Sequence, residues 1–252
     1  MVPPWVPEPG DVGKQGDDGA AAPAGVPVAP AARFGGARRA LGDFAKSGST
    51  ASLRRGLRKY ASRGLGGSRT AARRMGGVAV RSGDLYGALR SLSGSPTTDG
   101  ASLDPALLSG RPAREIVDAL VELVSPGDGS QDAESSQHAI ASALSDLLAD
   151  QPAVDLGALT STEITWVLER HLVYEIHNRV QLDVGKSLID KAPSPATAMQ
   201  RLDEIRDYIQ ETVASAFRER RSDGMPLTNA DATKLAARVL EDTFAVFEEY
   251  VE

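Results

Sequence analysis

The 252-residue sequence contains no cysteine, which excludes disulfide bonds, thiolate metal sites and cysteine nucleophiles. The lack of cysteine fits a reducing cytoplasm, where we expect the protein to act. Aromatic residues make up only 5% of the chain, so we expect that part of it lies outside a packed core. No apolar run approaches the roughly 20 residues of a membrane span. The N-terminus also lacks the basic and apolar segments of a signal peptide.

Groups that could carry out a reaction are scarce as well. The chain has three histidines, and His171 and His177 are six residues apart, which places them on different faces of a helix rather than in a helical zinc pair. The glycine-rich segment 64–70 lacks the Lys-Ser or Lys-Thr ending of a phosphate loop, and no predicted strand precedes it. We therefore predict that the protein is not an enzyme and has no metal or cofactor.

Charge is distributed very unevenly along the chain. Residues 1–32 contain one lysine and four acids, a net charge of -3, and residues 33–90 contain fourteen Lys/Arg and two acids, a net charge of +12. Residues 91–252 contain thirteen Lys/Arg and twenty-eight acids, a net charge of -15, and the three values sum to the -6 of the whole chain. A basic segment between acidic ones indicates either binding of an anionic partner or docking of unlike charges within the chain.

The most regular stretch of the sequence is 160–189. Its apolar residues are one, three or four positions apart, the spacing of an amphipathic helix. Ser161 or Thr162 can cap its start, and Glu163 adds negative charge to the first turn. The stripe consists of Ile164, Val167, Leu168, Leu172, Ile176 and Val180. Similar stripes predict helices over 112–124, 134–149, 194–223 and 229–251. Together these segments predict an acidic all-α bundle over residues 104–252.

The remainder is predicted to form an arm before this bundle. Residues 1–32 are rich in Pro, Gly and Ala and lack periodicity, which predicts a flexible tail. Residues 33–92 are basic and interrupted by glycines. They are predicted to form short helices over 37–46, from a cap at Ser49, Thr50 or Ser52 to about Arg63, and over a turn or two from a cap at Ser82 with Leu85, Leu89 and Leu92. Residues 93–103 are a turn-rich linker. The predicted fold class is therefore mainly α, with an extended or flexible N-terminal arm followed by an all-α helical domain.

Two interpretations of the arm remain open. Its apolar anchors with arginines around them are typical of a protein-docking segment, whereas its cations could contact nucleic-acid phosphates with Tyr60 as a stacking ring. We favour protein docking, because aromatic residues are few and no nucleic-acid motif is present. The arm could also fold back on the acidic bundle of its own chain. The candidate partner-binding residues are Pro3, Pro4, Trp5, Phe34, Arg38, Arg39, Phe44, Leu53, Arg54, Arg55, Leu57, Arg58, Lys59, Tyr60, Arg63, Arg69, Arg73 and Arg74.

Four segments in this order resemble one known family. The segments VPPWVP, GGARRALGDF, GGSRTAARRM and WVLERHLVYEIHNRVQLDVG are similar to those of the QatB family, a subunit of the bacterial Qat anti-phage defence system. The resemblance covers nearly all of the chain. Members of the family usually carry a Gly/Ser-rich leader that begins with Met-Gly before VPPWVP, whereas this sequence begins at Met1-Val2, directly at the motif.

The resemblance implies a system of four components. The others are an ATPase, a QueC-like protein (QatC) of the 7-deazaguanine-forming family and a TatD-like nuclease. It implies that a QatB protein has no enzyme activity of its own, binds the QueC-like protein and offers its N-terminus as the acceptor of a nucleobase conjugate. Binding of nucleic acid by residues 33–90 is the alternative function.

Overall fold

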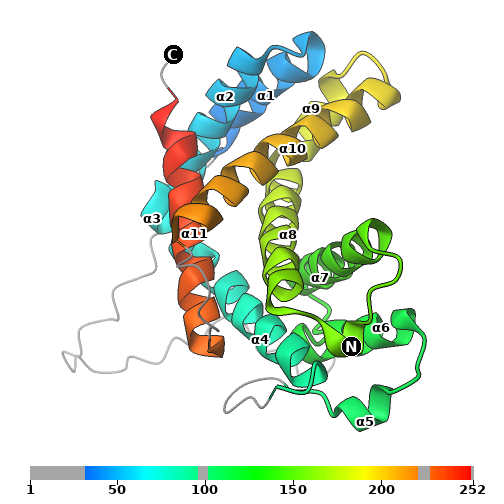
Figure 1. The fold of residues 1–252 in the computed structure, drawn as a ribbon. Coiled ribbons are helices and arrows are strands. Elements are labelled where there is room, and N and C mark those ends of the chain that lie inside the picture. The colour runs from blue at the N-terminus through cyan, green and yellow to red at the C-terminus, as the bar shows by residue number, and fades with distance from the viewer. Residues whose placement is uncertain (1–31, 96–101, 221–227, 251–252) are drawn as a thin grey trace, which may run out of the picture. The chain divides into compact units, whose positions relative to one another are not determined.

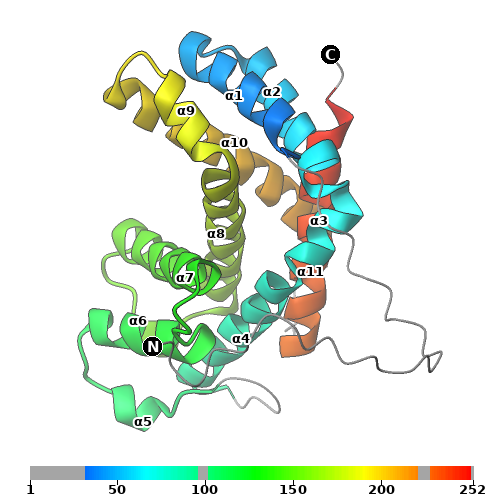
Figure 2. The same cartoon turned by 180° about the vertical axis from the view of Figure 1, so that it is seen from behind.

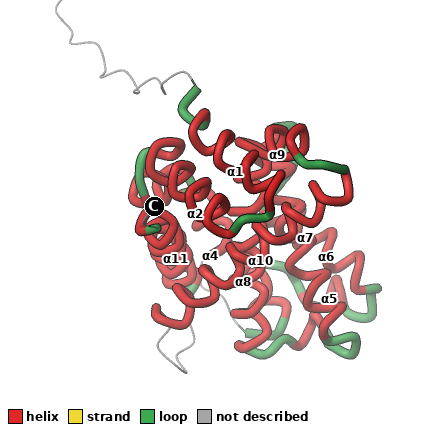
Figure 3. Tube along the Cα trace, turned by 90° about the horizontal axis from the view of Figure 1, so that it is seen from above, coloured by secondary structure: helices red, strands yellow, loops and turns green. Residues whose placement is uncertain are grey.

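Helices make up all the regular structure that the computed structural model describes, in residues 32–95, 102–220 and 228–250. Figure 3 shows these helices and the loops between them, and the prediction of a mainly α fold is confirmed. No helix within the described ranges is long and apolar enough to cross a membrane. The predicted tail over 1–32, with Pro3, Pro4 and Trp5, lies outside the described residues except for Ala32.

The basic segment is almost entirely helical. It contains α1 (Gly35–Ser47), α2 (Thr50–Lys59), a π-helical segment (Tyr60–Leu65), α3 (Ser68–Arg74) and α4 (Gly76–Leu92). α1 ends because Gly48 has a φ of 68°, a left-handed conformation that glycine adopts without a steric penalty. α4 begins six residues before Ser82, the position predicted for its cap.

The acidic segment contributes the remaining helices. These are α5 (Pro105–Leu108), α6 (Ala113–Val124), α7 (Gln131–Asp150), a 3₁₀ turn (Leu156–Ala158), α8 (Ser161–Val180), a second π-helical segment (Gln181–Gly185), α9 (Lys186–Lys191), α10 (Pro195–Arg220) and α11 (Asn229–Glu249). In Figure 1, α8 stands at the centre, and α4, α7 and α10 all pack against it. The helix predicted from the longest apolar stripe is therefore the central packing element.

The start of α8 follows from a reciprocal cap. The Thr160 backbone N–H donates to Glu163 Oε2 over 2.7 Å, and the Glu163 backbone N–H donates to Thr160 Oγ1 over 3.3 Å. The cap is thus one residue earlier than Ser161, the first of the predicted positions. A capping box requires the hydroxyl residue three positions before the glutamate, and Thr160 is the residue that satisfies this spacing.

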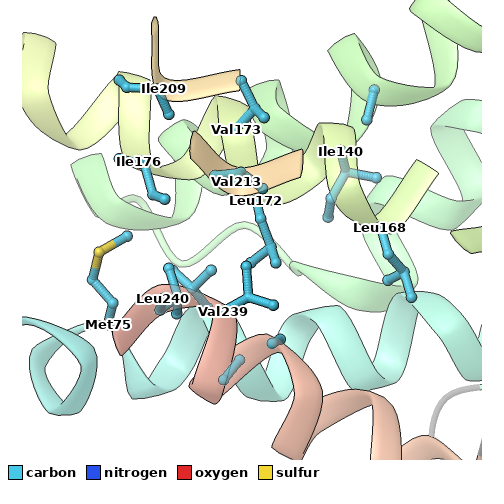
Figure 4. Packing of buried hydrophobic residues seen from close by; sticks show 14 of the residues in the cluster. Met75, Ile140, Leu168, Leu172, Val173, Ile176, Ile209, Val213, Val239 and Leu240 are labelled. Atoms are coloured by element: carbon cyan, nitrogen blue, oxygen red, sulfur yellow. The ribbon is translucent and has the colours of Figure 1, made fainter. Parts of the chain in front are cut away.

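One hydrophobic core joins the basic and acidic segments. In Figure 4, Leu172 of α8 points toward Val239 and Leu240 of α11, and Met75 from the junction of α3 and α4 lies beside them. Residues 32–252 form a single compact unit. The structure thus differs from the prediction of an arm over 33–92 that is separate from a bundle over 104–252. Helices α1 to α4 pack against α8, α9 and α11, so the arm has folded back on its own chain.

Glycines make the closest of these contacts possible. α4 packs along α11, and a Cβ added at Gly83 would lie 2.0 Å from Thr233 Oγ1 and 2.8 Å from the Asn229 carbonyl oxygen. A Cβ at Gly87 would lie 2.2 Å from Asn229 Nδ2. The two helices can approach to this distance only because both positions lack a side chain.

α3 packs against α11, as Figure 2 shows from behind, and unlike charges meet at this contact. Glu248 of α11 accepts a hydrogen bond from the Ser68 backbone N–H over 3.0 Å, at the N-terminus of α3. Arg69 Nε lies 3.4 Å from Glu241 Oε1. A carboxylate is stabilised at a helix N-terminus by the free N–H groups and the helix dipole. Part of the charge asymmetry seen in the sequence is therefore used inside the fold.

Candidate functional site

A groove with a volume of about 590 Å³ opens between α1 and α2, beside the end of α11. A volume of this size lies within the roughly 300–1,000 Å³ that is usual for ligand sites. We call it the basic groove; it is lined by Arg39, Ala40, Asp43, Thr50, Ala51, Arg54, Arg55, Lys59 and Tyr250.

The described residues compensate little of the charge of the basic groove. Arg55 Nη2 lies 3.6 Å from Asp43 Oδ2, in a half-exposed ion pair. Arg39, Arg54 and Lys59 have no carboxylate partner among the residues that the structure describes. Four cations and one carboxylate leave the lining with a net charge of +3. Such a surface attracts anionic groups and accelerates their association.

An aromatic ring completes one side of the groove. The Cζ of Arg54 lies 5.6 Å from the ring centroid of Tyr250, within the range of a cation–π contact. The Tyr250 hydroxyl is hydrogen-bonded to the Tyr208 hydroxyl, and its ring lies 6.5 Å from the ring of Phe247. Burial and the bond to Tyr208 raise the pKa of Tyr250 well above its ordinary value, so this hydroxyl remains neutral.

The groove forms here because the other faces of α1 and α2 are buried. Leu41 and Leu57 are fully buried, and a Cβ at Gly56 would lie 2.5 Å from Leu41 Cδ2, which shows how closely the two helices pack. The arginines of α2 are left on its outer side. The like charges of Arg55 and Lys59, four residues apart, oppose the helix by roughly 0.2–0.5 kcal/mol. Packing against the core outweighs this repulsion.

The predicted apolar anchors are not part of an accessible docking surface. Their exposed fractions are 6% for Phe34, 1% for Phe44, 4% for Leu53, and 0% for both Leu57 and Tyr60. Their assignment as partner-binding residues is corrected, because all five belong to the hydrophobic core of the chain itself. They are covered by the packing of α1 against α2, which includes the stacked rings of Phe34 and Tyr60, and by α9 and α11 from the acidic segment.

Two of the predicted arginines, Arg38 and Arg69, make contacts within the protein itself. The Arg38 guanidinium donates to the Asp183 carbonyl oxygen from Nε over 3.1 Å and from Nη2 over 2.8 Å. This ties α1 to the second π-helical segment. Nearby, the Tyr60 hydroxyl donates to Asp183 Oδ2 over 2.8 Å, which joins the two π-helical segments to each other. Arg69 is paired with Glu241, as described above.

The structure brings together four predicted residues, Arg39, Arg54, Arg55 and Lys59, in the basic groove. Arg58 is half-buried, Arg63 is exposed beside the π-helical segment, and Arg73 and Arg74 are exposed on α3. The candidate partner-binding surface therefore contains fewer of the listed residues than the sequence predicted.

Sequence reasoning missed several functional candidates. Tyr250 reaches the groove from about two hundred residues away, and no local pattern links it to α2. Asp43 was noted only as one of two acids in a basic segment. Asp183 serves both Arg38 and Tyr60, and a lone aspartate on a predicted helix gives no sign of this role.

The fold and the groove define a protein whose described residues form an all-α domain with a concave cationic surface. A family model described as QatB, Qat anti-phage system associated protein QatB, matches residues 66–247, which is most of the chain. The chain therefore belongs to the QatB family and is a component of the Qat anti-phage system. Searches of curated proteins and of solved structures found no match. The lining of the basic groove lies outside the matched range.

Proposed function

We propose that this chain is a non-enzymatic subunit of a bacterial Qat-type defence complex and binds the QueC-like protein of that system. The observation that carries the proposal is the net +3 charge of the basic groove, where Arg39, Arg54 and Lys59 have no carboxylate partner within the described ranges while Arg38 and Arg69 are engaged by the fold. The basic groove lies on α1 and α2, the first two helices that the structure describes. An acidic surface of the partner would complement it. The Qat ATPase and the TatD-like nuclease are further candidate partners, and we place the assembly in the cytoplasm.

The chemistry of the lining supports a binding role. Its ionisable groups are three arginines, one lysine, one tyrosine and one aspartate, and Asp43 is already paired with Arg55. Neither a histidine nor a pair of carboxylates lines the groove, although these are the usual groups for acid–base catalysis. We therefore assign recognition of the partner to this surface and the chemical steps to the other subunits.

Charge reversal of the groove tests the proposal. We expect that Arg39→Glu, Arg54→Glu and Lys59→Glu, combined in the full chain, slow association with the purified QueC-like protein by about 10- to 100-fold near physiological salt. These side chains are exposed or half-exposed, so folding should be retained. Surface plasmon resonance at two salt concentrations measures both the rate and its salt dependence.

A matched control uses cations elsewhere on the surface. Arg111 just before α6, Arg114 on α6 and Arg218 on α10 are all exposed. Their combined reversal to glutamate changes the net charge by the same amount but leaves the groove intact. We expect association within about twofold of the wild-type rate, because charges beyond the Debye length of about 8 Å are screened. Equal losses in both triple variants, or no loss in either, would contradict docking through the groove.

Nucleic-acid binding is the second candidate function. The observation that favours it is the combination of free cations with the Tyr250 ring, since phosphates bind cations and bases stack on aromatic rings. The same triple groove variant separates the two functions. Binding of arbitrary DNA or RNA that is tight near physiological salt and lost in the variant would favour nucleic acid. Unchanged weak binding, together with slower partner association, would favour protein docking.

The N-terminus is the proposed acceptor of a nucleobase conjugate. This proposal rests on the family resemblance, and the residues concerned lie outside the described ranges. Intact-mass measurement of the chain, purified with and without an active QueC-like protein, tests it. We expect a mass increase that depends on that protein and maps to the N-terminal peptide after proteolysis. An unchanged mass from cells that express the whole system would refute the conjugation but not the docking.

A further inference from the structure

A second, smaller hollow lies on a different part of the molecule, between the start of α4, the start of α7 and the end of α8. Its volume is about 160 Å³. Room of this size corresponds to about five water molecules, so it is too small for a nucleotide or a peptide segment. We call it the Arg81 pocket and define it by its charged lining residues Arg74, Arg81, Asp132, Glu175 and Arg179.

A chain of buried polar side chains lies behind Arg81. Ser82 Oγ is 3.5 Å from His171 Nδ1, His171 Nε2 is 3.3 Å from Glu175 Oε1, and Glu175 Oε1 is 3.6 Å from Arg81 Nε. Ser82, His171 and Glu175 are all at least 95% buried. Burying a carboxylate and an imidazole is unfavourable unless something compensates for the lost water. The fold nevertheless places these groups in a line that ends at the Arg81 guanidinium.

The buried polar side chains behind Arg81 are incompletely hydrogen-bonded within the described part of the protein. Arg81 Nε, Ser136 Oγ, His171 Nε2 and Glu175 Oε1 are buried atoms without a hydrogen-bond partner of good geometry. Burial lowers the pKa of His171 to about 3, so its ring is neutral and carries a single N–H. Glu175 Oε1 lies within 3.6 Å of both His171 Nε2 and Arg81 Nε, so these buried groups face one another and position the Arg81 guanidinium, which lines the hollow.

The charges of the pocket identify the kind of ligand. Arg179 is engaged by Asp132 over 3.2 Å and by Asp183 over 3.3 Å. Arg74 has no partner among the described residues, and Arg81 is held only by its contact with Glu175. Three guanidinium groups and two carboxylates leave a net charge of +1. An anion is therefore favoured over a cation.

The position of Arg81 suits an anion with two oxygens. Its Nε lies 3.6 Å from Glu175 Oε1, and Nη1 and Nη2 donate no hydrogen bond within the described part of the chain. A Cβ at Gly77 would lie 3.3 Å from Arg81 Nη1, so the guanidinium extends over the bare backbone of Gly77, another lining residue. A guanidinium fork matches the geometry of a carboxylate or a phosphate.

We propose that the Arg81 pocket binds a compact oxyanion, a carboxylate or phosphate group, with Arg81 as its main ligand and Arg74 as the second. Glu175 is a positioning residue that fixes the Arg81 guanidinium. His171 and Ser82 support Glu175 from inside the core. The site is independent of the basic groove, so neither proposal depends on the other.

Nuclear magnetic resonance of the full chain tests the proposal. The Nε–H signals of the arginines are followed while inorganic phosphate, or separately acetate, is added at constant ionic strength. We expect one arginine signal to shift saturably, and this signal should be missing in Arg81→Lys, which keeps the charge but loses the fork. The affinity measured by calorimetry should fall about tenfold or more in that variant. A response to phosphate alone assigns a phosphate group, and a response to acetate alone assigns a carboxylate.

Two further variants distinguish the proposal from unspecific charge binding. Arg54→Gln removes a cation from the basic groove and should leave the saturable shift unchanged. Glu175→Gln is nearly isosteric and should weaken the anion affinity and broaden the Arg81 signal, which a purely structural role of Glu175 would not do. Should Arg81→Lys fail to fold, Arg74→Gln replaces it, with an expected loss of affinity. The proposal is overturned if neither ion shifts an arginine signal saturably, or if Arg54→Gln abolishes the shift.

Discussion

The contact between α4 and α11 can be tested by adding a single methyl group at Gly83. The Cβ of Gly83→Ala would lie 2.0 Å from Thr233 Oγ1 and 2.8 Å from the Asn229 carbonyl oxygen. The Thr233 hydroxyl donates to that same carbonyl over 3.0 Å, so it cannot turn away without losing its bond. The Asn229 carbonyl belongs to the backbone of α11 and moves only with the helix. The methyl group therefore forces α4 and α11 apart.

The expected change combines two opposing effects. Overpacking in a tight contact costs about 1–3 kcal/mol, and replacing glycine by alanine inside a helix contributes about 1 kcal/mol in the opposite direction. Since backbone atoms are involved, we expect the upper part of the first range. The net effect is a loss of about 1–2 kcal/mol in the free energy of unfolding. Urea denaturation followed by circular dichroism measures it, with the slope checked for two-state behaviour.

Gly76 at the start of α4 provides the control. A Cβ there has no heavy atom within 4 Å, so Gly76→Ala should be neutral or stabilise the protein by up to about 1 kcal/mol. Thr233→Ala removes the nearer of the two clashing atoms and should partly restore Gly83→Ala, a coupling that a double-mutant cycle detects. A Gly83→Ala protein as stable as Gly76→Ala would show that the basic segment does not pack on α11 as described.

Three further perturbations address single interactions. Tyr60→Phe removes a buried hydrogen bond to Asp183 and should reduce the free energy of unfolding by about 1.5–3 kcal/mol in the same urea assay. Glu248→Ala removes the acceptor at the start of α3, and we expect a loss of about 0.5–2 kcal/mol there. Because the pKa of His171 falls from 6.5 to about 3 on folding, only the unfolded chain gains this proton as the pH is lowered from about 7 to about 5. Stability should fall by about 2 kcal/mol over that range, and His171→Gln should remove this part of the pH dependence.

Local sequence patterns predicted the helices whose apolar stripes are regular. Ile164, Leu168, Leu172 and Ile176 are at most 2% exposed, as the spacing of four along α8 requires. The stripe contains enough information because a helix with one apolar face must bury that face against something. It does not say against what, and the helices that cover α8 could not be derived from its own sequence.

The role of glycine in the close packing of the basic segment was not predicted from the sequence. Gly48 ends α1, as expected of a residue that punctuates a helix. Gly56, Gly64 and Gly83 instead lie inside helical segments, where a Cβ would meet Leu41, Phe34 or Thr233 at 2.6 Å or less. A glycine that permits close packing has the same local signature as one that breaks a helix. The partner residue decides between the two roles, and that partner is distant in sequence.

The two candidate sites differ in whether neighbouring residues of the sequence or distant ones form them. Arg54, Arg55 and Lys59 were predicted together because one short helix carries them. The Arg81 pocket draws on α3, α4, α7 and α8, and its buried glutamate and histidine are on a helix whose sequence gave no sign of a polar site. Sequence reasoning considered His171 as a possible zinc ligand and gave no sign that it is fully buried. Only the packing of four helices brings these groups together.

Charge asymmetry was the strongest signal in the sequence, and it offered two explanations that the fold separates. Docking of unlike charges inside the chain accounts for Arg69 with Glu241 and for Glu248 at the start of α3. If this were the whole explanation, the cations of α1 and α2 would also face acids of the chain. Arg39, Arg54 and Lys59 instead line the basic groove, which contains a single carboxylate. Like charges held together without a counter-charge are unfavourable for the isolated chain. Their arrangement becomes favourable when an anionic surface covers them, which is why we place the partner there.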